Sequence, residues 1–168
     1  MKIFFLSDAN SIHTLRWVKS LSSRNCKIKL FSLFKPNNVF IEEYDKLNIK
    51  VVSPDLSSRI KNLREPNISK IRYLQAIPLL KKTIKNFNPD LLHAHYSSSY
   101  GVLAFLVRFK PYILSVWGSD ISYFPYKNIF NRWITNLVIK NATKICSTSY
   151  AMKDIIQNKN NIKNLSKF

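Results

Sequence analysis

Two short segments of the chain hold the side chains best suited to proton transfer or ligand binding. One is His93-Ala94-His95, with two imidazoles two residues apart, and the other is Trp117-Gly118-Ser119-Asp120, which joins an aromatic ring, a hydroxyl and a carboxylate. An imidazole titrates near neutral pH and can donate or accept a proton. His95 and Asp120 are therefore the candidate catalytic residues. A third ligand at metal-binding spacing is not evident, so no metal is expected.

Each of these residues also has a structural interpretation. His93 is interpreted as a core histidine satisfied by a backbone carbonyl, whereas His95 lies nearer the end of its strand and is the better functional candidate. Asp120 fits a helix-capping role as well as a catalytic one. Trp117 either stacks on the apolar face of a ligand or fills the edge of the domain. Gly118 is one of only two glycines, which indicates a special backbone angle or the close approach of a ligand.

Alternating strands and helices are predicted to position these segments. Apolar runs predict short strands at residues 2–7, 27–33, 49–52, 90–95, 112–116 and 144–148. Such alternation predicts an α/β fold, a Rossmann-like parallel sheet with helices on both faces. Ligands bind beyond the carboxyl ends of such strands. The candidate binding residues there are Asn10, Ser11, His13, His95, Tyr96, Trp117, Gly118 and Ser119.

Helical spacing predicts which side chains face the core. Helices are expected from residue 12 to about 22 and at 69–87, 100–109, 127–141 and 151–157, with a loop and at most one helical turn at 35–46. Pro78 is expected to bend or break the second helix, and the helix at 100–109 is expected to be deeply buried. In the second helix the inward residues are Ile71, Leu74, Ile77, Leu80, Ile84 and Phe87. In the helix at 127–141 we expect Phe130, Trp133, Ile134, Leu137 and Val138 to face inward and Asn131, Arg132 and Asn136 outward.

The length and charge of the chain bound its class. A chain of 168 residues fits one domain, assigned to residues 1–157, followed by a basic, frayed tail at 158–168. The excess of 27 Lys and Arg over nine Asp and Glu leaves a formal charge of +18 and favours an anionic partner. Lys, Ile and Asn are all over-used, as in proteins of AT-rich genomes, so charge alone does not decide the partner.

The segment from Arg59 to Lys85 has eight basic residues and one acidic residue, Glu65. An anionic lipid surface and a solvated helix face explain it equally well. Nucleic acid is not expected, because no nucleic-acid-binding motif is present. Two distant cysteines and the lack of a signal peptide favour a cytoplasmic location, with peripheral contact to the inner face of the membrane as an option.

The loop after the first strand excludes two large classes of nucleotide-binding protein. It is Ser7-Asp8-Ala9-Asn10-Ser11 and contains no glycine. A dinucleotide-binding fingerprint and a phosphate-binding P-loop are therefore both excluded. This loop either offers helix amides to an anion or is a plain polar turn.

Three segments together resemble family 4 glycosyltransferases. Residues 1–8 with 11–17 look like the opening of that family, 88–96 are similar to its fourth strand, and 115–120 resemble its fifth strand and active-site loop. The resemblance implies a GT-B architecture of two Rossmann-like domains, of which this chain is the first, acceptor-side one. It also implies a nucleotide-sugar co-substrate, no cofactor, a carbohydrate or glycolipid acceptor, and transfer that is usually retaining and needs no metal.

Two departures from the family pattern bear on activity. Many relatives have a glycine-rich first loop, and many have histidine where this chain has Trp117, whose ring cannot exchange a proton. The donor-binding domain, with its paired glutamates, is expected on a separate polypeptide or to be missing. The chain by itself is therefore expected to be inactive. The alternative is a non-catalytic basic module that binds anionic membrane or nucleic acid.

Overall fold

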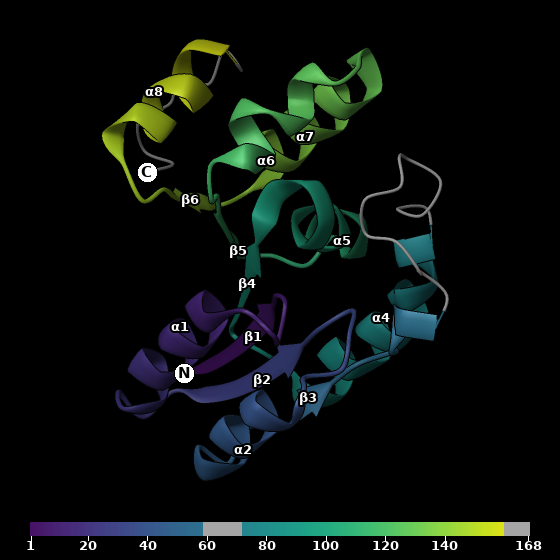
Figure 1. Cartoon of the computed structure of the whole chain (residues 1–168), viewed down its shortest axis with the longest axis vertical. Helices are drawn as coiled ribbons and strands as arrows, with labels where there is room; N and C mark the ends of the chain where they lie inside the picture. The colour runs from purple at the N-terminus through teal and green to yellow at the C-terminus, as the bar shows by residue number, and fades with distance from the viewer. Residues whose placement is uncertain (59–71, 160–168) are drawn as a thin grey trace. The chain divides into compact units, whose positions relative to one another are not determined.

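The computed structural model describes residues 1–58 and 72–159 (Figure 1). The chain divides into two compact units, Met1–Leu91 and Leu92–Phe168. Strands and helices alternate along the chain, and the strand pairings inside each unit are parallel. The predicted Rossmann-like α/β fold is confirmed.

The first unit has three parallel strands in the order β3-β2-β1. They are β1 (Lys2–Leu6), β2 (Lys27–Phe31) and β3 (Val51–Val52). Its helices are α1 (Ile12–Ser22), α2 (Asn38–Lys46) and α4 (Ile77–Phe87), and two 3-10 turns are η1 (Leu56–Ser58) and η2 (Arg72–Ala76).

Side chains of β1 alternate between the two faces of this sheet. Phe4 points to one face, where its ring centroid lies 6.3 Å from that of Phe87 at the end of α4. Ile3 and Phe5 point to the other face, where they join a buried cluster that includes Leu15 of α1 and Tyr44 of α2. Helices therefore cover both faces of the sheet in this unit.

The second unit has the parallel strands β4 (Leu91–His95), β5 (Tyr112–Ser115) and β6 (Lys144–Cys146) in that order. A π-helical turn, η3 (Tyr96–Tyr100), follows β4 directly and leads into α5 (Gly101–Val107). The remaining elements are α6 (Ser119–Ser122), the 3-10 turn η4 (Phe124–Tyr126), α7 (Ile129–Asn141) and α8 (Tyr150–Lys159).

Two expectations for the first unit need correction. The segment at 35–46 is not mainly a loop, because α2 occupies residues 38–46 and Asn37 caps it by accepting a hydrogen bond from the Phe40 amide at 3.2 Å. The second is the inward position of Leu74. The break expected at Pro78 is itself confirmed, because η2 precedes the proline and α4 begins at Ile77 with Pro78 in its first turn. Leu74 lies in η2, outside the register of α4, and is exposed. The part of that helix at 69–71 lies outside the described residues, as does the first part of the basic segment, residues 59–71, with four of its eight basic residues.

The predicted inward face of α7 is wrong for its two largest side chains. Phe130 and Trp133 are exposed, whereas Asn131, expected outside, is buried. Asn131 can be buried because its backbone amide donates to Asn128 Oδ1 at 2.8 Å and its side-chain amide donates to the Phe124 carbonyl at 3.3 Å.

A close helix contact explains why no aromatic side chain faces inward on α7. A Cβ atom placed on Gly101 of α5 would lie 2.9 Å from Val138 Cγ1 of α7. Such a contact leaves no room for a large ring, and the other buried residues of α7 are Asn131, Thr135 and Ile139. The α5 helix is also less buried than expected, since Val102 and residues 105–107 are only half-buried.

Candidate functional site

Residues predicted to bind a ligand lie in two groups, one in each unit. Asn10, Ser11 and His13 follow β1 in the first unit. In the second unit His95 is the last residue of β4, Tyr96 follows it, and residues 117–120 follow β5. Both groups lie at or beyond the carboxyl ends of their strands, as the fold class predicts.

Asn10 links two loops of the first unit with its side-chain amide. Its Nδ2 donates to the Lys35 carbonyl at 3.0 Å, and its Oδ1 accepts from the Asn37 amide at 2.8 Å. Its backbone amide also donates to Asp8 Oδ1 at 3.0 Å. These bonds fix the loop after β1 against the loop after β2, which makes Asn10 a structural residue.

Ser11 and His13 lie at the start of α1. Ser11 occupies the N-cap position but its side chain makes no capping hydrogen bond. His13 is exposed in the first turn. The structure thus places both side chains at the surface of the loop that Asn10 holds.

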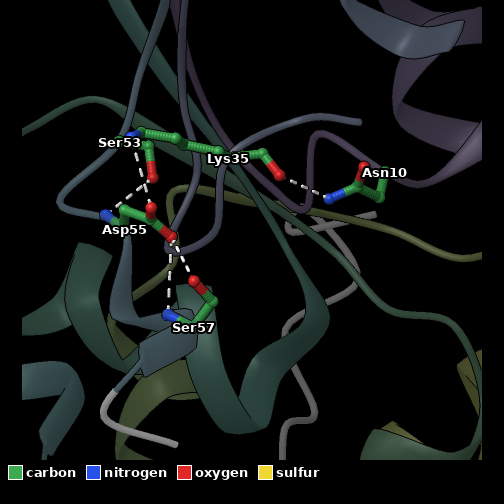
Figure 2. A network of polar contacts seen from close by, with 5 residues as sticks. All are labelled: Asn10, Lys35, Ser53, Asp55 and Ser57. Atoms are coloured by element: carbon green, nitrogen blue, oxygen red, sulfur yellow. Dashed lines mark hydrogen bonds and ion pairs between the residues drawn. The ribbon is translucent and has the colours of Figure 1, made fainter. Parts of the chain in front are cut away.

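A polar network continues from Lys35 and was not singled out in the sequence (Figure 2). Lys35 Nζ lies 3.3 Å from Asp55 Oδ2, and the Ser57 hydroxyl donates to Asp55 Oδ1 at 2.6 Å. The Ser57 hydrogen bond, with a smaller contribution from Lys35, lowers the pKa of Asp55. A cleft of about 310 Å³ beside this network is lined by Lys35, Tyr44, Asp45 and Ser53, among others.

The two histidines of β4 are both buried. His93 Nε2 lies 2.8 Å from the Ser115 hydroxyl on the neighbouring strand, and burial lowers the pKa of His93 to about 4. A neutral, hydrogen-bonded His93 belongs to the core. The His95 ring lies near edge-on to Trp117, with centroids 5.4 Å apart, and 4.7 Å from the His93 ring.

Asp120 ties the loop after β4 to the loop after β5. Its Oδ2 accepts from the Ser97 amide at 2.8 Å and its Oδ1 from the Trp117 amide at 3.0 Å. The Ser97 hydroxyl donates back to the Asp120 carbonyl at 3.0 Å. Asp120 has no exposed surface, so its carboxylate is a structural acceptor between two site loops rather than a cap at the start of α6.

The accessible part of this site consists of two hydroxyls and an indole ring. The Tyr96 and Ser119 hydroxyls lie 2.5 Å apart, Ser119 is exposed, and Tyr96 and Trp117 are half-buried. Tyr96 has φ +74° and Gly118 has φ +111°, a backbone region that is strained for most side chains and often found at functional sites. This arrangement can hydrogen-bond a ligand rich in hydroxyls and stack on its apolar face.

Neither unit supplies a metal centre from its described residues. Across 1–58 and 72–159, no group of three or more His, Cys, Asp or Glu side chains could hold a metal ion. In the same residues no helix has the length and apolar character needed to cross a membrane.

Parallel strands joined by helices, with the candidate binding residues at their carboxyl ends, define a Rossmann-like fold. The glycosyl transferase 4-like family matches residues 2–149, and the chain belongs to this family. The family resemblance of the sequence is therefore confirmed, and the fold is that of a GT-B glycosyltransferase-type domain.

Solved structures share this fold. A glycosyltransferase from Rickettsia africae is 18% identical, with TM-score 0.66 over 99% of this chain and 41% of its own. The UDP-GlcNAc 2-epimerase of Neisseria meningitidis, solved with UDP-GlcNAc, is 16% identical, with TM-score 0.64 over 95% of this chain and 43% of its own. MurG of Acinetobacter baumannii is 15% identical, with TM-score 0.57 over 90% of this chain and 41% of its own.

These similarities establish the fold and no more. The chain spans less than half the length of each of the three solved proteins. No curated protein sequence matches it.

Proposed function

We propose that this chain is the acceptor-side domain of a glycosyltransferase that moves a sugar from a nucleotide-sugar donor to a polysaccharide or glycolipid acceptor. Membership of the glycosyl transferase 4-like family supports the reaction class. The observation that carries the acceptor-binding role is the exposed hydroxyl pair of Tyr96 and Ser119 beside the half-buried ring of Trp117. Hydroxyls and an aromatic face together match the polar edge and apolar face of a sugar.

In this proposal the residues after β4 and β5 divide into binding and positioning groups. Trp117 stacks on the acceptor, and the Tyr96 and Ser119 hydroxyls bind its hydroxyl groups. Asp120 is a positioning residue, because its carboxylate is buried and bonded to two backbone amides. His95, packed against Trp117, orients the indole ring.

Transfer also requires donor binding, which we assign to a second domain. The solved relatives are more than twice as long as the matched region, and the epimerase of Neisseria meningitidis was solved with UDP-GlcNAc. Basic groups and helix amides of that domain would stabilise the leaving diphosphate, without a metal or other cofactor. We further propose a cytoplasmic location with peripheral contact to the inner face of the membrane.

Binding and transfer assays test the two parts of this proposal separately. Oligosaccharide and glycolipid acceptors are titrated against the purified chain by saturation-transfer NMR. Trp117→Ala is expected to weaken binding about tenfold, as for loss of one aromatic stacking contact, whereas Tyr150→Ala, an exposed ring on α8, is expected to leave it unchanged. Equal binding by Trp117→Ala and wild type would refute the assigned site.

The transfer assay uses a labelled nucleotide sugar with the chain alone and with a separately expressed donor-binding domain. No transfer is expected from the chain alone, and transfer is expected from the pair. Turnover by the chain alone would show that the proposed dependence on a second domain is wrong.

A further inference from the structure

The second unit exposes an unusual set of large apolar side chains within one short stretch. Between the end of α6 and the second turn of α7, five such residues are exposed by about half or more. They form what we call the aromatic face of α7: Tyr123 (64% exposed), Tyr126 (48%), Ile129 (81%), Phe130 (64%) and Trp133 (55%).

Helical spacing places the members of this face that lie in α7 on one side of the helix. Phe130 follows Ile129 directly, and Trp133 lies three positions after Phe130. The Phe130 and Trp133 ring centroids lie 5.8 Å apart. The opposite side of α7 carries Asn131 and Val138, which are buried. The aromatic face thus points away from the core of its own unit.

The charged residues in this stretch of the sequence, from 121 to 153, are all positive. Lys127 Nζ lies 4.8 Å from the centroid of the Tyr123 ring, and Arg132 is exposed beside Trp133 in the sequence. No Asp or Glu occurs between Asp120 and Asp154. Asp120 itself is fully buried and bonded to backbone amides.

This combination decides between possible occupants of the face. A second copy of the chain would bring the same cations together, and like charges at a contact oppose association. Tyr, Trp and Phe rings flanked by Lys and Arg are the composition of surfaces that lie in the interfacial region of a bilayer. Cations at such a surface are attracted by anionic lipid.

We propose that the aromatic face of α7 binds the surface of an anionic bilayer. The Phe130 and Trp133 rings enter the interfacial region, and Lys127 and Arg132 contact lipid phosphates. The inference deepens the proposed function and rests on it for one point, the delivery of a glycolipid acceptor. Tyr123 follows α6, which begins with the candidate site residue Ser119, so lipid held by this face would lie one short helix away from that residue.

Sedimentation with vesicles tests the binding directly. The full chain is mixed with phosphatidylcholine vesicles, with and without phosphatidylglycerol, across a salt series. Binding is expected only with the anionic lipid and should weaken with salt. The double variant Phe130→Ser/Trp133→Ser is expected to bind about tenfold more weakly or worse, and each of Lys127→Gln and Arg132→Gln about fivefold more weakly.

A matched control comes from the first unit, where Val39 and Ile41 of α2 are also exposed apolar side chains. Val39→Ser/Ile41→Ser is expected to bind vesicles as the wild type does. Trp133→Phe is the second test variant, because it keeps an aromatic ring at the same place. It is expected to bind within about twofold of wild type while losing the vesicle-induced blue shift of tryptophan emission.

Three results would overturn the inference. The first is unchanged vesicle binding by Phe130→Ser/Trp133→Ser, with far-UV circular dichroism showing a folded chain. The second is a full blue shift in Trp133→Phe. The third is self-association of the wild type that the double variant abolishes while vesicle binding persists, which would assign the face to a second copy. Vesicle binding without any glycosyl transfer by the reconstituted pair would instead refute the proposed function and leave the lipid surface standing.

Discussion

The loop after β1 and the paired loops after β4 and β5 occupy equivalent places in their units but are stabilised in different ways. In the first, the side-chain amide of Asn10 bonds two backbone groups near the surface. In the second, the buried carboxylate of Asp120 bonds two backbone amides inside the unit. The second pair of loops also contains the strained backbone of Tyr96 and Gly118.

This difference shows where binding groups remain accessible. The side-chain amide of Asn10 already makes the two hydrogen bonds that link the loops, so it is not available to a ligand. Because Asp120 stabilises the other loops from inside, the hydroxyls of Tyr96 and Ser119 stay at the surface. A buried acceptor therefore leaves the outer side chains of a loop available to a ligand.

The largest expected effect is that of Asp120→Ala. Removal of the carboxylate leaves the Ser97 and Trp117 amides without their acceptor in a largely buried site, which should lower the free energy of unfolding by about 3 kcal/mol. Urea titration measures this. Asp154→Ala, an exposed carboxylate on α8, should change it by less than about 0.5 kcal/mol. Equal losses of stability for Asp120→Ala and Asp154→Ala would show that the buried carboxylate does not stabilise the loops after β4 and β5.

The second prediction concerns the pH dependence contributed by His93. Burial lowers its pKa from 6.5 to about 4, so between these values the unfolded chain binds a proton that the folded chain does not. Stability from neutral His93 is therefore complete above pH 6.5 and is lost as the pH falls toward 4. Across this window wild type should lose about 3 kcal/mol more than His93→Gln, measured by urea titration at several pH values. If the free energies of unfolding of wild type and His93→Gln changed in parallel with pH, His93 would not be a buried neutral imidazole.

The third prediction separates backbone strain from packing with the only two glycines. Gly118→Ala should lower the free energy of unfolding by about 1–2 kcal/mol, because a side chain is strained at its φ of +111°. Crowding is not the cause, since the nearest atom to the new Cβ, Met152 Cε, is 3.7 Å away. Gly101→Ala should cost a similar amount through its 2.9 Å contact with Val138. Val138→Ala should therefore rescue Gly101→Ala in part, since two further atoms lie 3.0 and 3.2 Å from the new Cβ, whereas Met152→Ala should not rescue Gly118→Ala. Thermal unfolding of the two double variants measures both outcomes.

Asn10→Ala is expected to have a smaller effect than Asp120→Ala. The variant loses two hydrogen bonds, but water can bond to the freed backbone groups in this half-buried position. The free energy of unfolding should therefore fall by about 1 kcal/mol. Urea titration against Asn158→Ala, an exposed amide on α8, measures the difference. A loss as large as that of Asp120→Ala would mean that the first loop is stabilised as firmly as the second pair.

The smallest effect on stability is expected at the Tyr96 and Ser119 hydroxyls. Tyr96→Phe and Ser119→Ala should each change the free energy of unfolding by less than about 0.5 kcal/mol, because both groups can bond to water. Acceptor binding should nevertheless weaken, by about fivefold or more for each variant, if these hydroxyls contact the acceptor. Acceptor titration and urea titration of the same proteins give both numbers. A large loss of stability with unchanged acceptor binding would assign the pair a structural role.

Part of the candidate site could be predicted from residue types and strand ends alone. The places of His95, Trp117 and Ser119 follow from apolar runs that end in polar residues, since buried parallel strands are continuously apolar and end at the ligand-binding edge. Accessibility could not be predicted, because it depends on partners distant in sequence. Ser97 and Asp120 are 23 residues apart, and only their hydrogen bond shows that the carboxylate points inward.

The sequence by itself determined the α/β class and the location of the strands, because these depend on local apolar patterning. It also indicated α7 as a two-sided helix. Only the tertiary structure decided which side of α7 is buried, because the close approach of Gly101 to Val138 excludes large rings from that contact. The aromatic residues Phe130 and Trp133 are consequently at the surface, where periodicity alone had placed them in the core.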